Sequence, residues 1–290
     1  MLSRTSSGLL ALHRFYGCDF VVFVEGGYAG DGEIHNDGDD DTPDTMFWQR
    51  MFKEFARNPT FYFKSMGSKS ALLHYVKAIL EDDIPTLVVC MDRDFDHVSD
   101  KLVMHPRILY TRGYSWENDI SLRAVLREAF LYNCTVTAKT KLLCEEMLIT
   151  YDSSLEKLGP FVFWDYILLR NGQGLFPRDG SAKPVLLRKT LAPDIDVLLL
   201  EGRVSGAQTQ ILSPNPPSLI PCRDVYGHCI ARLAYHSFVY FMKKANKKYR
   251  IDFDGFVRSS INHLMSVVKR GEAPEINAHY EKIIGRILSN

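Results

Sequence analysis

The chain contains the run Leu87-Val88-Val89-Cys90-Met91-Asp92-Arg93-Asp94-Phe95-Asp96. Its first five residues are apolar, a pattern typical of a strand that is buried on both faces of a parallel sheet. Side chains alternate between the two faces of an extended segment, so Asp92, Asp94 and Asp96 are expected to point the same way. Three carboxylates would then follow the end of a buried strand.

A second run of the same kind ends in an acid near the start of the chain, Val21-Val22-Phe23-Val24-Glu25-Gly26. Ligands of parallel sheets bind beyond the carboxyl ends of the strands, where Glu25 and the three aspartates are expected. Converging carboxylates repel one another and raise each other's pKa unless a cation joins them. Oxygen-only ligands favour Mg²⁺ or Mn²⁺ over zinc. The alternative interpretation is a solvated acidic loop after a strand.

Strand and helix patterns alternate in the first part of the chain. Strands are expected near residues 20–24, 60–65, 87–91 and 107–111, with a helix over 45–57 capped by Asp44 and another after Gly67-Ser68-Lys69-Ser70. This alternation is typical of βαβ units. It predicts an α/β fold, a Rossmann-like domain with a four-stranded parallel sheet, over residues 1–118.

Helical patterns dominate the rest of the chain and predict a mainly helical domain over residues 119–290. Helices are expected over 120–131, 137–149, 158–169, 225–244, 253–268 and 276–288. A Ser153-x-x-Glu156 capping box would start the third of them. The apolar run Ile195–Leu200 is typical of a strand.

The two parts differ in charge although the 290 residues sum to zero. Residues 1–118 carry 12 basic and 18 acidic side chains, a net of −6, and residues 119–290 carry 23 and 17, a net of +6. This asymmetry favours a polyanion such as nucleic acid as partner of the second part. The densest basic cluster either contacts RNA phosphates or is a solvated helix end, and it comprises Lys243, Lys244, Lys247, Lys248 and Arg250.

Localisation and redox state follow from simpler features. The longest apolar stretches are interrupted by charged residues or histidine before they could span a membrane, and no secretory signal opens the chain, so a cytoplasmic protein is expected. The six cysteines include no CxxC pair. Buried reduced thiols are therefore favoured over a zinc half-site at Cys222, His228 and Cys229.

Glu-Gly after the first strand and the DxDxD run after the third resemble the Toprim domain of topoisomerases, primases and some nucleases. In that family the acids gather Mg²⁺ around a phosphodiester. The resemblance implies that Glu25, Asp92 and Asp94 are catalytic metal ligands of two Mg²⁺ ions and that Asp96 is an additional acid. Gly67-Ser68-Lys69 lies where topoisomerases carry a Gly-Lys turn, which implies a phosphate-binding role for Lys69.

Further motifs resemble a Toprim-containing effector family of bacterial defence, to which the Toprim subunits of PARIS anti-phage systems belong. They are the segments 23–26, 47–48, 67–69, 91–96, 110–111 and 113–118, with Gly227-His228 in the helical part. The resemblance implies a toxic nuclease that an ABC-type ATPase partner holds silent. It would be released as a homodimer to cut host RNA, preferably tRNA, in abortive infection. The loop from Gly27 to Pro43 departs from the family by its length and acidity.

Two side chains near these motifs have two interpretations each. Glu117 follows the fourth strand and is either a further metal ligand or a helix N-terminal acid placed for the dipole. His97 is either a proton shuttle or a structural histidine. Two other functions stay open, a topoisomerase- or primase-like DNA enzyme and a non-catalytic Toprim binding module.

Overall fold

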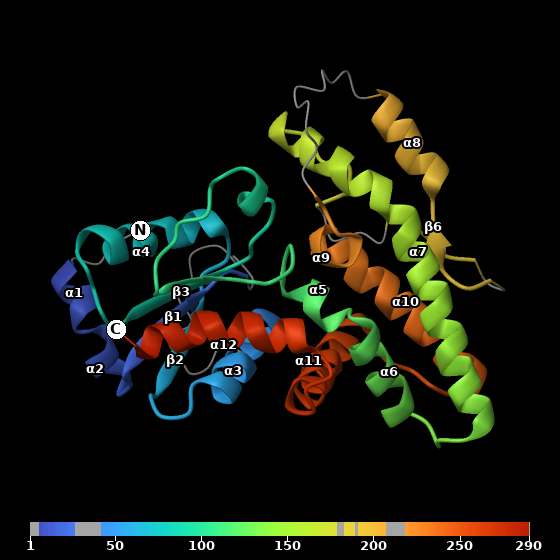
Figure 1. Cartoon of the computed structure of the whole chain (residues 1–290), viewed down its shortest axis with the longest axis horizontal. Coiled ribbons are helices and arrows are strands. Elements are labelled where there is room, and N and C mark those ends of the chain that lie inside the picture. Colours follow the sequence, from blue (N-terminus) through green and yellow to red (C-terminus); the bar gives the residue numbers. More distant parts are fainter. Residues whose placement is uncertain (1–5, 27–41, 179–182, 189–190, 207–217, 290) are drawn as a thin grey trace. The chain divides into compact units, whose positions relative to one another are not determined.

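The computed structural model describes residues 6–26, 42–178, 183–188, 191–206 and 218–289. The chain divides into two compact units (Figure 1). The first comprises residues 1–93, 102–112 and 274–290, and the second comprises 94–101 and 113–273. This division differs from the predicted boundary at residue 118, because the C-terminal helix belongs to the first unit and residues 113–118 belong to the second.

The first unit contains a four-stranded, all-parallel sheet with the strand order β2-β1-β3-β4. Its strands are β1 (Phe20–Val24), β2 (Phe61–Ser65), β3 (Leu87–Met91) and β4 (Ile108–Tyr110). Parallel neighbours need crossover connections, and α3 (Pro43–Phe55) and α4 (Lys69–Glu81) supply two of them. The prediction of an α/β fold with a four-stranded parallel sheet is confirmed.

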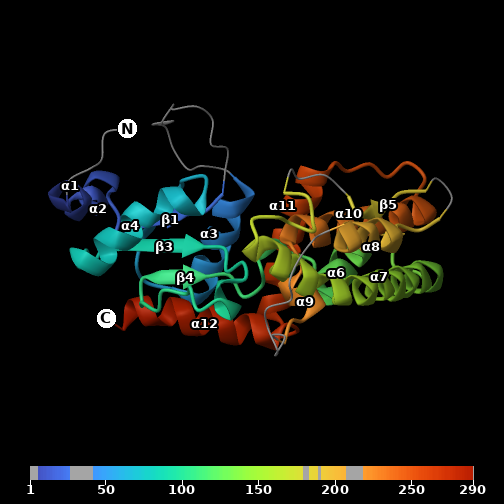
Figure 2. The ribbon, with the colours of Figure 1, turned by 90° about the horizontal axis from the view of Figure 1, so that it is seen from above.

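Both faces of the sheet are covered, as the uniformly apolar strands predict. One face packs against α4 and the N-terminal helices α1 (Ser6–Leu10) and α2 (Leu12–Tyr16), through a core that includes Val21, Phe23, Leu72, Ile79 and Val89. The residues that alternate with these, such as Val22 and Val88, are fully buried on the opposite face. On that side lie α3 and α12 (Pro274–Leu288), the latter along the sheet in Figure 2. The rings of Phe47 and Trp48 on α3 meet that of Tyr280 on α12 edge-on.

The register of the two central strands places their carboxyl ends side by side. Val22 pairs with Val88, and Val24 pairs with Cys90. Glu25 follows the last residue of β1, and Asp92 follows the last residue of β3. The two acids that the sequence singles out therefore leave adjacent strands at the same edge of the sheet.

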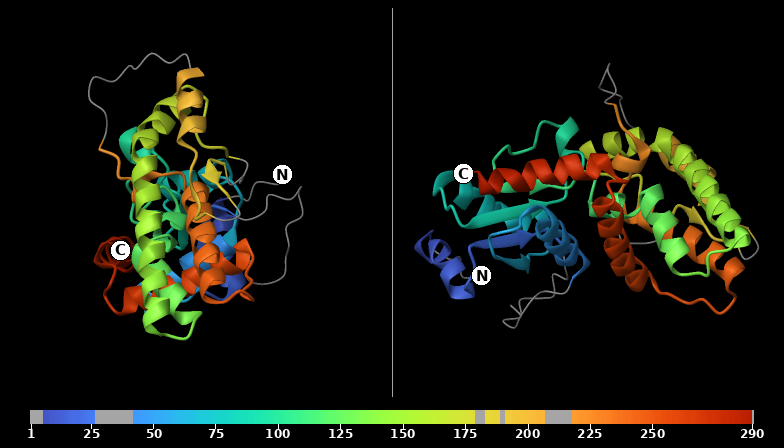
Figure 3. Two further views of the ribbon diagram at one scale, coloured as in Figure 1. Left: turned by 90° about the vertical axis from the view of Figure 1, so that its right-hand side faces the viewer. Right: turned by 60° about the horizontal axis from the view of Figure 1, so that its bottom comes forward.

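The described residues of the second unit form helices, one 3-10 turn and a short antiparallel pair of strands. The helices are α5 (Trp116–Ile120), α6 (Arg123–Tyr132), α7 (Ala138–Arg170), α8 (Val197–Gly206), α9 (Pro221–Asp224), α10 (Gly227–Ala245) and α11 (Phe253–Lys269), and the strands are β5 (Val185–Leu186) and β6 (Asp194–Ile195). The long helix α7 runs beside α10 (Figure 3). Rings such as those of Phe130 and Phe238 meet in the interior of this unit.

The prediction of two helices over 137–149 and 158–169 is wrong, because α7 is continuous from Ala138 to Arg170. The hydroxyl groups within it donate to carbonyl groups one turn earlier, Thr150 to Glu146 and Ser154 to Thr150. Such back-bonding lets Ser and Thr remain inside a helix. The predicted helix over 120–131 is in turn divided, since α5 ends at Ile120 and α6 begins at Arg123.

Two further local predictions are wrong because a different residue caps the helix. Thr42, and not Asp44, is the N-cap of α3, where its side chain accepts the Thr45 backbone N–H. The strand expected over 195–200 is limited to Asp194–Ile195 in β6. Asp196 accepts the Leu199 N–H at 3.0 Å and so starts α8 at the next residue.

The cysteines and the helix lengths give two further results. All six cysteines are free, and Cys90, Cys144 and Cys229 are buried. Burial raises the pKa of the Cys229 thiol to about 12, which keeps it protonated and unsuited to bind zinc. Among the helices in the described ranges, none combines the length and apolarity that crossing a bilayer requires.

Candidate functional site

The carboxylate of Glu25 lies over the start of the segment that follows β3. The Glu25 backbone N–H donates to the Cys90 carbonyl at 2.9 Å, which continues the β1–β3 ladder by one residue. The Asp92 backbone N–H then donates to Glu25 Oε2 at 3.0 Å. Both acidic residues are half-buried. The structure thus brings together two acids that are 67 residues apart in sequence.

A glycine pair ties the loop after β2 to this edge. Gly26 and Gly67 exchange both backbone hydrogen bonds, at 2.6 and 2.8 Å. Both have a positive φ angle, +111° and +80°, which residues other than glycine rarely adopt. Lys69 follows two residues later as the first residue of α4, a 13-residue helix. The bridge therefore holds the N-terminus of α4 and Lys69 at the edge that carries Glu25.

The structure adds one acid to this edge, Asp44. A Cβ atom built on Gly26 would overlap with the Asp44 carboxylate, so that carboxylate packs directly on the glycine next to Glu25. Sequence reasoning missed it because an acid at the start of α3 was given the capping role that Thr42 fulfils. The separation of Glu25 and Asp44 in the sequence matches no motif that would pair them. Most of the acidic loop between them, residues 27–41, lies outside the described residues.

The predicted alternation of Asp92, Asp94 and Asp96 along one face is wrong. β3 ends at Met91, Asp94 has a left-handed backbone with φ of +49°, and Asp96 begins the 3-10 turn η1 (Asp96–Val98). The backbone turns because the Asp94 N–H donates to the Tyr114 carbonyl at 2.7 Å instead of continuing a ladder. Asp94 and Asp96 belong to the second unit, whereas Glu25 and Asp92 belong to the first.

A buried ion pair lies against Tyr114, whose carbonyl accepts the hydrogen bond from the Asp94 N–H. Asp165 is completely buried and accepts from Arg178 Nη2 at 2.8 Å. The Arg178 guanidinium lies 4.0 Å from the ring centre of Tyr226 and 5.6 Å from that of Tyr114. Burial raises the pKa of Tyr114 well above its usual value, so the ring stays neutral. Helix α7 thus supports the backbone position of Asp94 through Arg178 and Tyr114.

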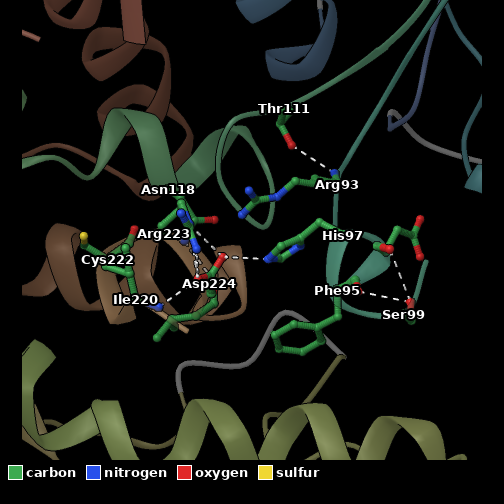
Figure 4. Close-up of polar contacts among 12 residues, drawn as sticks. Arg93, Phe95, His97, Ser99, Thr111, Asn118, Ile220, Cys222, Arg223 and Asp224 are labelled. Atoms are coloured by element: carbon green, nitrogen blue, oxygen red, sulfur yellow. Dashed lines mark hydrogen bonds and ion pairs between the residues drawn. The ribbon is translucent and has the colours of Figure 1, made fainter. Parts of the chain in front are cut away.

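His97 is held by a buried acid. Its Nε2 lies 3.6 Å from Oδ1 of Asp224, which is fully buried (Figure 4). The Asp224 carboxylate also accepts the Ile220 backbone N–H at 2.8 Å and Arg223 Nη2 at 2.9 Å. Only 19% of the His97 side chain is exposed. Of its two interpretations, this environment favours the structural histidine over a proton shuttle.

Glu117 is buried in the first turn of α5, where its Oε1 lies 3.5 Å from His228 Nε2. The Gly227 backbone approaches so closely that an added Cβ would overlap with the Ser115 hydroxyl and lie 3.0 Å from Glu117 Oε2. That oxygen has no hydrogen-bond partner among the described residues. It is available to a ligand, so the role of Glu117 in cation binding stays a prediction. The contact with Glu117 also engages His228, one of the three residues of the zinc half-site that the sequence already disfavours.

The predicted basic cluster lies at the C-terminal end of α10. Lys243 and Lys244 occupy the last turn of the helix, where cations stabilise the helix dipole, and Lys247, Lys248 and Arg250 follow. All five are exposed. Lys244 pairs with Glu146 at 3.2 Å, and Arg250 donates to the carbonyls of Lys247 and Tyr249. The cluster therefore retains most of its positive charge for a partner.

The acidic residues at this edge of the sheet have the oxygen chemistry that suits a hard divalent cation. Glu25, Asp92 and the nearby Asp44 offer only carboxylate oxygens, which Mg²⁺ and Mn²⁺ prefer. Within the described ranges, no group of three or more His, Cys, Asp or Glu side chains is arranged to hold an ion. No protein-family model matches the sequence, and a search among curated proteins finds no match.

Proposed function

We propose that this chain is a Mg²⁺-dependent nuclease of the Toprim type, the toxic effector of an anti-phage system. One observation carries the proposal, the hydrogen bond from the Asp92 backbone N–H to the Glu25 carboxylate at the carboxyl ends of the two central parallel strands. Ligands of such sheets bind at this place, and the two acids come from separate strands, so neither position follows from the other. A solvated acidic loop would not require this convergence.

A bound divalent cation would stabilise the negative charge that develops on a phosphodiester and lower the pKa of a coordinated water. Glu25 and Asp92 would hold it through carboxylate oxygens. The resemblance to Toprim domains further implies that Asp94 is a ligand of the same ion and that Asp96 supports a second ion. Asp44, which packs on Gly26, would position Glu25 or add a further oxygen.

Lys69 and the start of α4 would orient the substrate. The helix N-terminus presents backbone N–H groups and a positive dipole end, which favour an anion. The Ser68 side chain makes no cap hydrogen bond to the backbone there. The ammonium group of Lys69 would neutralise a non-bridging phosphate oxygen at the same place. These residues bind and align the phosphodiester, whereas the acids carry the cation.

The substrate and the partners follow from the resemblance of the sequence motifs to defence effectors. Host RNA, preferably tRNA, is the proposed substrate, and the net charge of +6 over residues 119–290 supports a polyanion. An ABC-type ATPase would hold the nuclease silent, and release would yield an active homodimer.

The test is cleavage by the purified full-length chain. Total tRNA, single-stranded RNA and plasmid DNA are each incubated with Mg²⁺, Mn²⁺ or EDTA, with the wild type and Glu25→Ala. The matched control is Glu81→Ala, which removes an acid from the C-terminal end of α4, where it pairs with Lys77. We expect metal-dependent cleavage of RNA that falls at least about 10³-fold in Glu25→Ala, roughly 4 kcal/mol of transition-state stabilisation.

Equal cleavage by Glu25→Ala and the wild type would overturn the assignment of the catalytic acids. Cleavage of plasmid DNA alone would favour the topoisomerase- or primase-like alternative. Absence of any cleavage, both alone and after addition of the ATPase, would leave a binding module as the function.

A further inference from the structure

One arginine of the second unit is partly buried without a neutralising acid. Arg232 lies on α10, and its guanidinium carbon is 3.7 Å from the ring centre of Phe253, the first residue of α11. Its Nε atom is buried and has no hydrogen-bond partner among the described residues. Burial lowers the pKa of Arg232, and no carboxylate opposes this shift. The protein therefore carries the desolvation cost of this cation without the usual compensation.

The acids on the adjoining helix are already engaged. Asp252 caps α11 by accepting the Gly255 N–H at 2.8 Å, and Asp254 accepts from Arg258 Nε at 2.8 Å. Tyr235, beside Arg232, uses its hydroxyl to donate to the Ile251 carbonyl. None of these groups is an anionic partner of Arg232. A cation–π contact with Phe253 accounts for the stacking of the guanidinium, but it gives the N–H donors of that group no hydrogen-bond acceptor.

Residues of similar chemistry continue along the same face of α10. Positions four apart are neighbours on a helix, which aligns Arg232 with His236 and Tyr240, and Lys243 follows in the last turn. Arg232 and Lys243 are about 16 Å apart along the helix axis at 1.5 Å per residue. Lys243 is exposed and joins the basic cluster at the end of the helix. The stripe combines the guanidinium of Arg232 and the ammonium group of Lys243 with the rings of His236 and Tyr240 between them. Single-stranded nucleic-acid sites also combine cations with aromatic rings.

We propose that Arg232 binds a phosphate of the nucleic-acid backbone and that the stripe Arg232–His236–Tyr240–Lys243 guides a single strand along α10. The proposal rests on the proposed nuclease function, because it names the surface that holds the substrate of that enzyme. The chemistry suits phosphate, since a guanidinium donates in a fork that matches two phosphate oxygens. The phosphate belongs either to a polynucleotide or to a free anion, and the experiment separates these sources.

The test measures binding rather than cleavage, with full-length Glu25→Ala as the parent protein and EDTA present. A labelled single-stranded RNA oligonucleotide is titrated at several NaCl concentrations, and fluorescence anisotropy gives Kd. The variant is Arg232→Gln, and the matched control is Arg258→Gln, which removes a charge that Asp254 already neutralises. We expect Arg232→Gln to weaken binding about tenfold and to reduce the salt slope by roughly 0.7 to 1, the signature of one lost phosphate contact.

Arg232→Lys keeps the charge but loses the fork and the planar stack, so intermediate binding is expected, and circular dichroism checks that each variant is folded. Equal Kd values for folded Arg232→Gln, Arg258→Gln and the parent would overturn the proposal and make Arg232 a packing residue on Phe253. In a second arm, inorganic phosphate replaces RNA and thermal unfolding is the readout. Phosphate stabilisation that requires Arg232, with RNA binding unchanged, would overturn the nucleic-acid assignment in favour of a small-anion site.

These outcomes are independent of the proposed reaction, because the parent protein lacks Glu25 and the cation is chelated. RNA binding that depends on Arg232 can be observed even if the cleavage assay fails. Conversely, cleavage by the wild type with no effect of Arg232→Gln on Kd would sustain the nuclease and overturn the binding stripe.

Discussion

The polar groups of the sheet edge and those of the helical unit reach their places by different routes. At the edge, Glu25 and Asp92 each follow a buried strand, and the parallel register of those strands brings them together. In the helical unit, Asn118 donates to the Val225 carbonyl across 107 positions, and this contact depends on how whole helices pack. The edge acids lie where a ligand of the sheet would bind, whereas the buried side chains of Asn118 and Asp165 are hydrogen-bonded within the helical unit. Substitutions should therefore affect activity at the edge and stability in the helices.

The largest stability effect that would sharpen this contrast is expected from Arg178→Met. Burial raises the pKa of the Asp165 carboxyl, and Arg178 together with the Leu175 and Phe176 N–H groups opposes that shift. Removal of the arginine leaves a buried acid without its counter-charge, which costs about 3–5 kcal/mol. Urea unfolding at pH 7 measures the loss.

A control separates the ion pair from general loosening of its loop. Arg203→Met removes a hydrogen bond to the Leu175 carbonyl in the same loop and leaves Asp165 paired. It should cost no more than about 1.5 kcal/mol. Equal losses in the two variants would contradict a specific role of the Asp165–Arg178 pair.

Asn118→Ala should have the next largest effect. The fully buried amide accepts the Ser115 N–H at 3.0 Å and donates to the carbonyls of Val225 and Cys222 at 2.9 and 3.3 Å. The variant leaves buried backbone groups unsatisfied, which costs about 2–3 kcal/mol. Chemical denaturation compares it with Asn133→Ala, whose half-buried amide follows α6, donates to the Ala129 carbonyl and accepts from the Tyr249 hydroxyl at 3.4 Å. A smaller loss of unfolding free energy in Asn118→Ala than in Asn133→Ala would contradict this prediction.

His236 should give a smaller effect that depends on pH. Burial, aided by the charge of Arg232, lowers the pKa of His236 to about 4 in the folded state, from 6.5. Between these values the unfolded chain binds a proton that the folded chain does not, so stability is lost as the pH falls from 6.5 towards 4. Because the side chain is only partly buried, the loss is discounted to about 1 kcal/mol.

His236→Gln removes the titrating group. Its free energy of unfolding should therefore fall less than that of the wild type between pH 7 and pH 4.5, as measured by urea titration at both values. Parallel decreases in the two proteins would show that His236 does not titrate below its usual range.

Sequence reasoning could predict the part of the molecule in which pattern determines backbone path. The apolar runs before Glu25 and Asp92 specify buried strands, and four strands with crossover helices follow from their alternation. The helix over 253–268 is also confirmed, since α11 spans Phe253–Lys269. In each case one periodicity extends over a whole element, and no distant contact is needed to interpret it.

The wrong predictions have two kinds of physical cause. Some depend on contacts between residues that are distant in sequence, and others on local hydrogen bonds that compete with the predicted ones. The DxDxD run leaves the extended conformation because Asp94 bonds to Tyr114, which lies far along the chain. Asp44 reaches Gly26 only through tertiary packing, and its position at a helix start suggested a cap. Helix α7 continues through the predicted cap at Ser153, and the neighbouring Thr150 and Ser154 hydroxyls donate to carbonyl groups one turn earlier, which no spacing rule reveals.

The central claim is that the acids at the sheet edge bind a divalent cation. Isothermal titration of Mn²⁺ into the full-length wild type, Glu25→Gln, Asp92→Asn and the control Glu81→Gln tests it without reference to any substrate. We expect the wild type and Glu81→Gln to bind Mn²⁺ with equal affinity. Glu25→Gln and Asp92→Asn should each bind it at least about tenfold more weakly, a loss of roughly 1.4 kcal/mol. Identical isotherms for all four proteins would contradict it.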